Sequence, residues 1–450
     1  MIPTHIIEEF VEAACVPTGP GGGSHSSGGL EKASGLLEQY PSLASETLYT
    51  AAIWGDEKMI REKLSQGSID INAKTGPRNW DVLTYLCFSR FLRLDPTRSE
   101  NFTDAARVLL EAGANANTGF QETGPYPDWE PVLYGAAGVA HHAGVTKVLL
   151  AYGADPNENE VMYHSPETYG NDAMVALIDS GKLNRDSLAS MLLRKADYHD
   201  IAGMKLLLEA GAEPNYITMW GYTALHQALR RDNRLAQIEL LLDYGGDPLL
   251  PEKHHGHSAL SIAIYRGRKD VLQLLLDRGV VINVSGLEKL IYACAMNDRE
   301  EIKIMTTEDP HLFNIIRVHG GRLLSLFAGT SNEEGVACLL DLGIPVTALY
   351  EGDGYFGIPA NSMALHVAAW KAWHAVVQLL IERGAPVNAL DGNGRTALQL
   401  AVRACTDSYW MWRREPTSIR LLLEAGALKE GIILPTGYEE ADKLLMNQPL

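Results

Sequence analysis

The 450-residue chain has few of the features that mark secretion or membrane insertion. Its five cysteines are odd in number and scattered, with no C-x-x-C pair. That pattern favours reduced thiols over disulfides and gives no zinc framework. No run of eighteen apolar residues occurs, and no basic region precedes an apolar stretch at the N-terminus. We therefore expect no membrane span, no signal peptide and a cytoplasmic protein.

Basic residues are also scarce. The chain has 38 Lys and Arg residues and 56 Asp and Glu residues, which gives a formal net charge of −18. Non-specific nucleic-acid binding needs an excess of Lys and Arg to neutralise phosphates, so nucleic acid is not an expected partner. The motifs G-x-x-x-x-G-K-[ST], H-E-x-x-H and G-x-S-x-G are absent. The sequence thus gives no argument for an enzyme, and we expect no cofactor and no metal.

An internal repeat is the strongest positive feature. The stretch "GYTALHQALRRDNRLAQIELLLDYGGDP" (221–248) is followed by the similar "GHSALSIAIYRGRKDVLQLLLDRGVVIN" (256–283). Apolar runs that end in glycine mark the units along the chain, and a hidden boundary at 304–310 divides the longest interval. The marker glycines are Gly113, Gly153, Gly181, Gly211, Gly245, Gly279, Gly343, Gly384 and Gly426. Such a period is typical of repeat proteins, whose units bury their apolar faces only by stacking.

Each unit is expected to form two helices. Thr223 is a good N-cap for a short first helix, in which Leu225 and Leu229 face inward at i, i+4. A second helix carries the stripe that includes Leu241, and Gly245 supplies the left-handed residue that ends it. The sequence therefore predicts helix pairs joined by tight turns.

The pattern T-x-L-H-x-A followed by "LLLxxGADPN" resembles the ankyrin repeat. Matching segments are "TALHQAL" (223–229), "MALHVAA" (363–369) and "TALQLAV" (396–402), with "GADPN" at 153–157. The resemblance implies an all-α solenoid of about twelve helix pairs with β-turn fingers, of the long, multi-repeat, bacterial type. It also implies a non-enzymatic scaffold that binds a protein or peptide on its concave face and fingers.

The expected organisation has three parts. Residues 1–44 form a divergent N-terminal capping unit with a flexible Gly/Ser-rich loop at 17–29, residues 45–426 form the repeat array, and residues 427–450 form a capping tail. Four insertions interrupt the array. Those at 119–131 and 348–362 replace fingers, and those at 88–102 and 402–416 lengthen the connection between two helices of a unit.

The fourteen histidines leave a second class of function open. The resemblance makes His226 and His366 structural, and His199 and His374 fall at turns between helices. His141, His142 and His164 lie in adjacent units and could converge. A metal-binding or hydrolytic protein that uses histidines around His141, His164 and His199 is thus the alternative. An immunity or regulatory partner of a neighbouring-gene product is a third possibility.

In ankyrin-like units, the two residues after the conserved core of the first helix lie on the concave face. Several units of this acidic chain place Arg or Lys there, often beside an aromatic residue, and both types are enriched in interface hot spots. They would equally balance the negative end of a short helix. On the first interpretation, the partner has acidic or aromatic segments and the chain is a monomer. The predicted partner-binding residues are Trp220, Tyr222, Arg230, Arg231, Tyr265, Arg266, Trp370 and Lys371.

Overall fold

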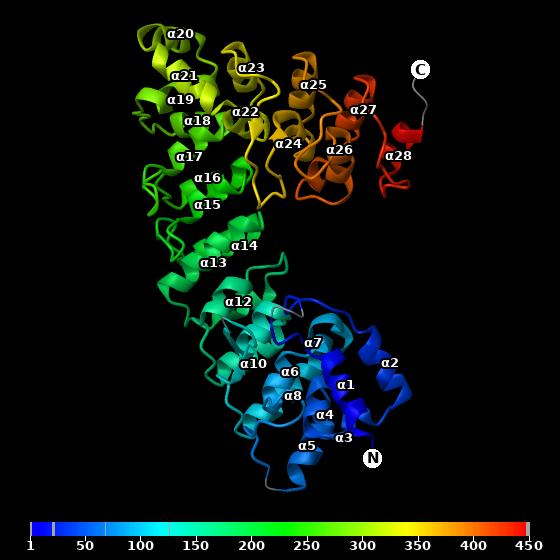
Figure 1. Cartoon of the computed structure of the whole chain (residues 1–450). Coiled ribbons are helices and arrows are strands. Elements are labelled where there is room, and N and C mark those ends of the chain that lie inside the picture. Colours follow the sequence, from blue (N-terminus) through cyan, green and yellow to red (C-terminus); the bar gives the residue numbers. More distant parts are fainter. Residues whose placement is uncertain (1, 20–22, 68, 126, 447–450) are drawn as a thin grey trace. The chain divides into compact units, whose positions relative to one another are not determined.

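The computed structural model describes residues 2–19, 23–67, 69–125 and 127–446. Helices dominate it, and the two sheets are small antiparallel hairpins, β1–β2 and β3–β4 (Figure 1). The chain divides into two compact units. Unit 1 comprises Met1–Asp247 with Glu252–His255, and unit 2 comprises Pro248–Pro251 with Gly256–Leu450. The predicted all-α class is confirmed.

In its described residues, unit 1 contains the first sixteen α-helices and two short helices of other pitch. In chain order these are α1 (Thr4–Ala14), α2 (Glu31–Gln39), α3 (Leu43–Glu46), α4 (Leu48–Trp54), α5 (Glu57–Ser65), α6 (Val82–Cys87), α7 (Arg90–Leu94), η2 (Pro96–Arg98), α8 (Ser99–Glu111), α9 (Val132–Tyr134), η3 (Gly135–Val139), α10 (Ala143–Ala151), α11 (Asn159–His164), α12 (Asp172–Asp179), α13 (Arg185–Asp197), α14 (Ile201–Glu209), α15 (Ala224–Arg230) and α16 (Leu235–Asp243).

Unit 2 contains the remaining helices. In chain order these are α17 (Ala259–Tyr265), α18 (Lys269–Asp277), α19 (Gly286–Met296), α20 (Arg299–Glu308), α21 (Pro310–Val318), α22 (Gly320–Ala328), α23 (Glu333–Asp341), α24 (Ala364–Trp370), α25 (His374–Glu382), α26 (Ala397–Thr406), η4 (Met411–Arg413), α27 (Thr417–Glu424) and α28 (Glu439–Met446).

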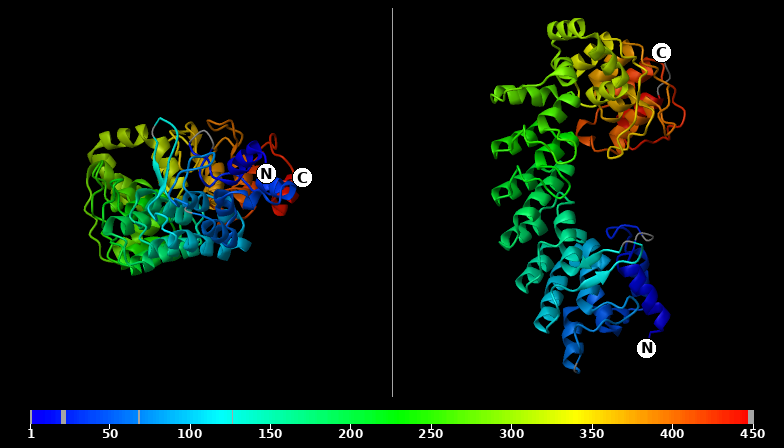
Figure 2. Two further views of the ribbon diagram at one scale, coloured as in Figure 1. Left: turned by 90° about the horizontal axis from the view of Figure 1, so that it is seen from below. Right: turned by 60° about the vertical axis from the view of Figure 1, so that its left-hand side comes forward.

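Within each unit, the helices follow one another as pairs, and like members of successive pairs stack. In unit 1, α13 packs on α15 and α14 packs on α16 (Figure 2); in unit 2, α22, α24 and α26 stack in turn. The described residues give twelve pairs, seven in unit 1 and five in unit 2, as predicted. The pairs are α1–α2, α4–α5, α6–α8, η3–α10, α11–α12, α13–α14 and α15–α16, then α17–α18, α19–α20, α22–α23, α24–α25 and α26–α27.

Local sequence explains why the repeating helices begin and end where they do. Thr223 caps α15 through a reciprocal capping box with His226, whose Nδ1 lies 2.7 Å from the threonine hydroxyl. Leu225 and Leu229 of this helix are buried, as predicted from their i, i+4 spacing. After α16, Gly245 adopts a φ of 86° that favours glycine, which ends the helix as its position predicts.

The asparagine at the end of the "GADPN" turn joins successive pairs. Asn117 donates from Nδ2 to the carbonyl of Gly153 at 2.9 Å, and its Oδ1 accepts from the Asp155 backbone N–H at 2.8 Å. Asn215 makes the same two bonds to Gly245 and Asp247, and Asn388 makes them to Gly426 and Leu428. Because these bonds satisfy backbone groups left over at a helix end, the repeated asparagine fixes the spacing between neighbouring pairs.

The two inserted fingers form the predicted hairpins. β1 (Gly119–Gln121) pairs with β2 (Trp129–Pro131), and β3 (Leu349–Tyr350) pairs with β4 (Ser362–Met363). At 304–310, α20 ends at Glu308 and Pro310 begins the extra helix α21, since proline is well tolerated at the first helical position. The insertion at 88–102 is itself largely helical, as α7 and η2.

The described part of the Gly/Ser-rich segment makes hydrogen bonds to residues far along the chain. Residues 20–22 lie outside the described residues, but the carbonyl of Ser27 accepts from Nε of Arg90 at 3.2 Å, and that of Gly28 accepts from Arg93 at 3.0 Å. The carbonyl of Thr18 accepts from the backbone N–H of Thr123 at 2.6 Å. The described part of this segment is therefore held against later repeats of unit 1, by partners that lie roughly 60 to 105 residues away in sequence.

Among the described residues, no helix combines the length and the apolar character that a membrane crossing requires.

Candidate functional site

The first candidate site is a set of arginine and aromatic side chains on successive pairs of unit 1. α11, α13 and α15 are the first helices of three consecutive pairs, and α13 packs on both of the others. Arg194, in the last turn of α13, stacks its guanidinium over Tyr163 of α11 at 3.9 Å from the ring centroid. Arg230, the last residue of α15, stacks over Tyr222 at 4.0 Å. The pairs that begin with α13 and α15 thus each supply one arginine that lies on an aromatic ring.

The two stacks are linked by ring contacts. Trp220 lies beside Tyr163, with ring centroids 5.6 Å apart. The carbonyl of Trp220 lies 2.8 Å from Nε2 of His254, whose ring lies 5.3 Å from that of Tyr222. We define Tyr163, Arg194, Trp220, Tyr222 and Arg230 as the arginine–aromatic surface. Arginine and aromatic groups combine apolar area with directional donors, which is the chemistry that binds acidic and aromatic segments.

Arg231 has a different environment from its neighbour Arg230. Its Nε donates to Oδ1 of Asp197 at 2.6 Å, and Gln227 donates to the same oxygen at 2.6 Å. Arg194 pairs with the other carboxylate oxygen of Asp197 and also with Glu167. Burial lowers the pKa of Arg194, but the neighbouring carboxylates, led by Asp197, outweigh it and raise that pKa. Asp197 therefore ties α13 to the end of α15, and Arg231 is part of this link.

The other predicted partner-binding residues belong to unit 2. Tyr265 and Arg266 are half-buried at the end of α17. Trp370 and Lys371 are 6% and 2% exposed, so neither offers surface to a partner in this structure. Trp370 donates from Nε1 to the carbonyl of Phe356 at 2.7 Å, and Nζ of Lys371 lies 4.0 Å from the centroid of the Phe356 ring. The finger 348–362 covers this end of α24. The sequence prediction used only the position of a residue within its repeat, so it did not include the effect of an inserted finger.

The tryptophan-rich insertion at 402–416 also covers this end of α24. Trp410 is buried, its ring lies 5.4 Å from that of Phe356, and Lys371 lies 5.3 Å from the Trp410 ring. Tyr409 and Trp412 remain exposed. The insertion therefore closes over the apolar end of α24.

The histidines of the alternative function have separate structural partners. His142 caps α10, accepting from the Val145 backbone N–H at 3.1 Å. His164 lies between two carboxylates, with Nδ1 2.8 Å from Glu167 and Nε2 3.2 Å from Glu160. His199 has a φ of 53° in the turn after α13. In the part of the chain that the structure describes, no group spaced to hold a metal includes His141, His164 or His199.

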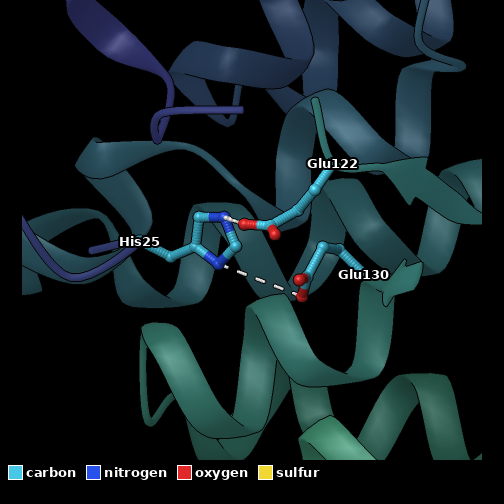
Figure 3. A group of neighbouring side chains, drawn as sticks. All are labelled: His25, Glu122 and Glu130. Atoms are coloured by element: carbon cyan, nitrogen blue, oxygen red, sulfur yellow. Dashed lines mark ion pairs between the residues drawn. The ribbon is translucent and has the colours of Figure 1, made fainter. Parts of the chain in front are cut away.

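His25, which the sequence gave no reason to select, belongs to the single metal-compatible group of the described residues. It lies with Glu122 and Glu130 of the first finger, and one ligand atom from each lies within 4.8 Å of the others (Figure 3). Burial lowers the pKa of His25 to about 4 and raises that of Glu130 to about 8, so burial disfavours the charged form of both side chains. His25 lies 97 residues before Glu122, the nearer of its two acidic partners in sequence. No local motif could therefore have identified it as a candidate metal ligand.

The arrangement of paired helices with capped, glycine-terminated ends and hairpin fingers defines an all-α repeat protein. Two family models match the chain, one described as ankyrin repeats (3 copies) over residues 191–286 and one as ankyrin repeats (many copies) over residues 361–407. Residues 191–286 and 361–407 of this chain therefore match ankyrin repeats.

Similar proteins include the mouse (Mus musculus) ankyrin repeat and SOCS box protein 6, which is 32% identical over 135 residues. That match covers 28% of this chain and 31% of the mouse protein, so the chain matches less than a third of its relative's length. A crystal structure of the human ASB11 ankyrin repeat domain is 23% identical, covers 59% of this chain and 98% of that chain, and has a TM-score of 0.26.

Proposed function

We propose that this chain is a non-enzymatic scaffold that binds a protein or peptide partner. Ankyrin repeats are generally protein-interaction modules, and two family models place them in this chain. The observation that carries the finer proposal is the repetition of one cation-on-ring stack in neighbouring pairs, Arg194 over Tyr163 and Arg230 over Tyr222. The proposed docking site is therefore the arginine–aromatic surface, on the face that the ankyrin resemblance makes concave.

The partner is proposed to present a segment rich in Asp or Glu together with aromatic residues. Arg230 has a half-buried side chain lying on a ring, so its guanidinium is held in one orientation before a partner arrives. Preorganisation of this kind lowers the entropy cost of binding. Carboxylates pair with the guanidinium edge, and rings of the partner stack on Trp220. Tyr265 and Arg266 of unit 2 remain a secondary part of the proposal.

A peptide-display selection on the whole chain tests this proposal. We expect enriched peptides to carry acidic and aromatic residues, and chosen synthetic peptides to bind more weakly as salt is added. Arg230→Glu combined with Trp220→Ala should weaken that binding by at least about 30-fold, because both groups are proposed hot spots. Glu239→Arg, on the second helix α16, is the matched control and should change binding less than about twofold.

Two outcomes would contradict the proposal. Peptides that bind the Arg230→Glu/Trp220→Ala variant as tightly as the wild-type chain would remove the arginine–aromatic surface from the site. If binding then depended on the exposed Tyr409 and Trp412 instead, the docking site would belong to unit 2.

The proposal also includes a monomeric, cytoplasmic protein. All five cysteines are buried free thiols, which supports a reducing compartment. Light scattering on the purified chain measures the oligomeric state, and imaging of a tagged chain in its host measures the location.

A further inference from the structure

A buried carboxylate beside His25 stands out among the charged groups of unit 1. Glu130 is 2% exposed, and its Oε2 accepts no hydrogen bond from any described residue. The nearest cation-forming atom is Nδ1 of His25, which lies 3.9 Å from that oxygen (Figure 3). A buried ionised carboxylate without a close partner is costly, so an oxygen in this position needs either a proton or a cation.

Aromatic rings enclose the side of the group that holds the imidazole. The ring of His25 makes edge contacts with Phe88, Phe120 and Tyr134 at centroid distances of 6.4, 5.8 and 5.7 Å. The Tyr134 hydroxyl lies 3.0 Å from Nδ1 of His25. This contact orients the imidazole so that Nε2 faces Glu122 of the finger, whose Oε1 lies 3.2 Å away. A ligand histidine in a metal site is oriented in the same way, by a partner on its other ring nitrogen.

The spacing and ligand types fit a small cation better than a salt bridge alone. In a tetrahedral zinc site with bonds of about 2.0–2.2 Å, neighbouring ligand atoms lie about 3.3–3.6 Å apart. The 3.2 Å separation of Nε2 and Oε1 is close to that spacing. Oε2 of Glu130 lies 3.9 Å from the other ring nitrogen, Nδ1, and one ligand atom of each side chain lies within 4.8 Å of the others, so Glu130 joins the set only after its side chain turns toward the ion. An imidazole nitrogen in the set favours zinc-type transition ions over Mg²⁺ or Ca²⁺, which prefer all-oxygen sites.

We propose that His25, Glu122 and Glu130 form a binding site for a divalent transition-metal ion of the zinc type, which fastens the Ser24–Gly29 segment to the finger β1–β2. Glu122 is the most exposed of the three ligands, so the ion enters from its side and water completes the coordination there. The metal joins residues about 100 positions apart, and its role is structural. This site is independent of the arginine–aromatic surface.

The test uses the full chain, stripped with a chelator and dialysed. Calorimetric titration with Zn²⁺ should show one tight site per chain, and zinc should raise the thermal midpoint of unfolding, because it binds the folded state. His25→Ala and Glu130→Gln should each weaken zinc binding by at least about 30-fold and abolish the thermal shift. Glu130→Gln keeps the shape of the side chain, and its thermal midpoint without metal shows that the variant folds.

Three controls separate this site from other zinc-binding side chains. His5→Ala and Glu8→Gln change exposed residues of α1 and should leave the tight site intact. The double variant His254→Ala/His257→Ala removes two of the three exposed histidines of "HHGH" and should also leave it intact. The proposal is overturned if zinc fails to bind tightly, if the double variant rather than His25→Ala loses the site, or if Mg²⁺ binds there as tightly as Zn²⁺. A chain that binds no metal, with Glu130→Gln as stable as wild type, would make the cluster a proton-sharing contact only.

Discussion

Nε of Arg231 donates to Oδ1 of Asp197 at 2.6 Å, and this bond joins the end of α15 to the end of α13. The adjacent Arg230 makes its contact with the Tyr222 ring instead. Two consecutive arginines of one repeat thus have different roles. Arg231 links two repeats, and Arg230 contributes to the arginine–aromatic surface.

Arg231→Glu should therefore destabilise the protein, whereas Arg230→Glu should not. The first change removes one of the cationic partners of the buried Asp197 and places a carboxylate beside it, and should lower the free energy of unfolding by about 2–4 kcal/mol. The second alters a half-buried position without an ion pair and should change it by no more than about 0.5 kcal/mol. Urea unfolding followed by circular dichroism measures both. Equal effects would mean that the Asp197 link contributes nothing to stability.

Lys195→Met should be among the most destabilising changes in unit 1. Lys195 is 0% exposed, and its Nζ donates to Oδ2 of Asp200 at 2.8 Å and to the Thr168 carbonyl at 2.6 Å. Removing the ammonium leaves a buried carboxylate and a carbonyl without their partner, at a cost of about 3–5 kcal/mol in urea unfolding. Lys205→Met, which breaks an exposed pair with Glu209, should cost less than about 1 kcal/mol.

A second change distinguishes charge from packing at this pair. Adding Asp200→Asn to Lys195→Met removes the uncompensated charge, while the asparagine side chain can still accept the Gly203 N–H that Asp200 accepts at 3.0 Å at the start of α14. The double variant should recover more than half of the lost stability. No recovery would show that the loss came from packing of the lysine stem.

The features that sequence predicted are local ones. Thr223 and Gly245 act on the ends of their own helices, so a short window of residues contains all the information needed. The repeat period then gives the stacking order, because a helix pair has an apolar face that only another pair can cover.

Features that depend on distant contacts were not predictable in this way. His25 is buried through the finger residues Glu122 and Glu130, and composition alone marked its segment as a flexible loop. The position of Trp370 at a helix end was predicted, but its burial depends on the path of the inserted finger that includes Phe356. A loop path of this kind is set by packing that appears only when the chain folds.

Gly321→Ala should destabilise unit 2, because α22 approaches a strand of the second finger through this residue. A Cβ at Gly321 would lie 1.8 Å from the Leu349 carbonyl oxygen, which is backbone and cannot rotate away. We expect a loss of about 3 kcal/mol, at the upper end for overpacking. Gly35→Ala in α2, where no atom lies within 4 Å, should instead stabilise the chain by about 0.5–1 kcal/mol. Urea unfolding compares the two, and a stable Gly321→Ala variant would contradict this close approach.

His164 should carry a positive charge at neutral pH. Burial lowers its pKa, but the hydrogen bonds and charges of Glu160 and Glu167 outweigh burial and raise the pKa to about 9. A group whose pKa is raised on folding stabilises the protein below its unfolded pKa of about 6.5, and this stabilisation is lost as pH rises to about 9.

We expect the imidazole resonance of His164 in an NMR titration to shift near pH 9. In the variant Glu160→Gln/Glu167→Gln the midpoint should fall below about 6.5, because burial then acts alone. A His164 midpoint near 6.5 in the wild-type chain would show that the two carboxylates do not hold its proton.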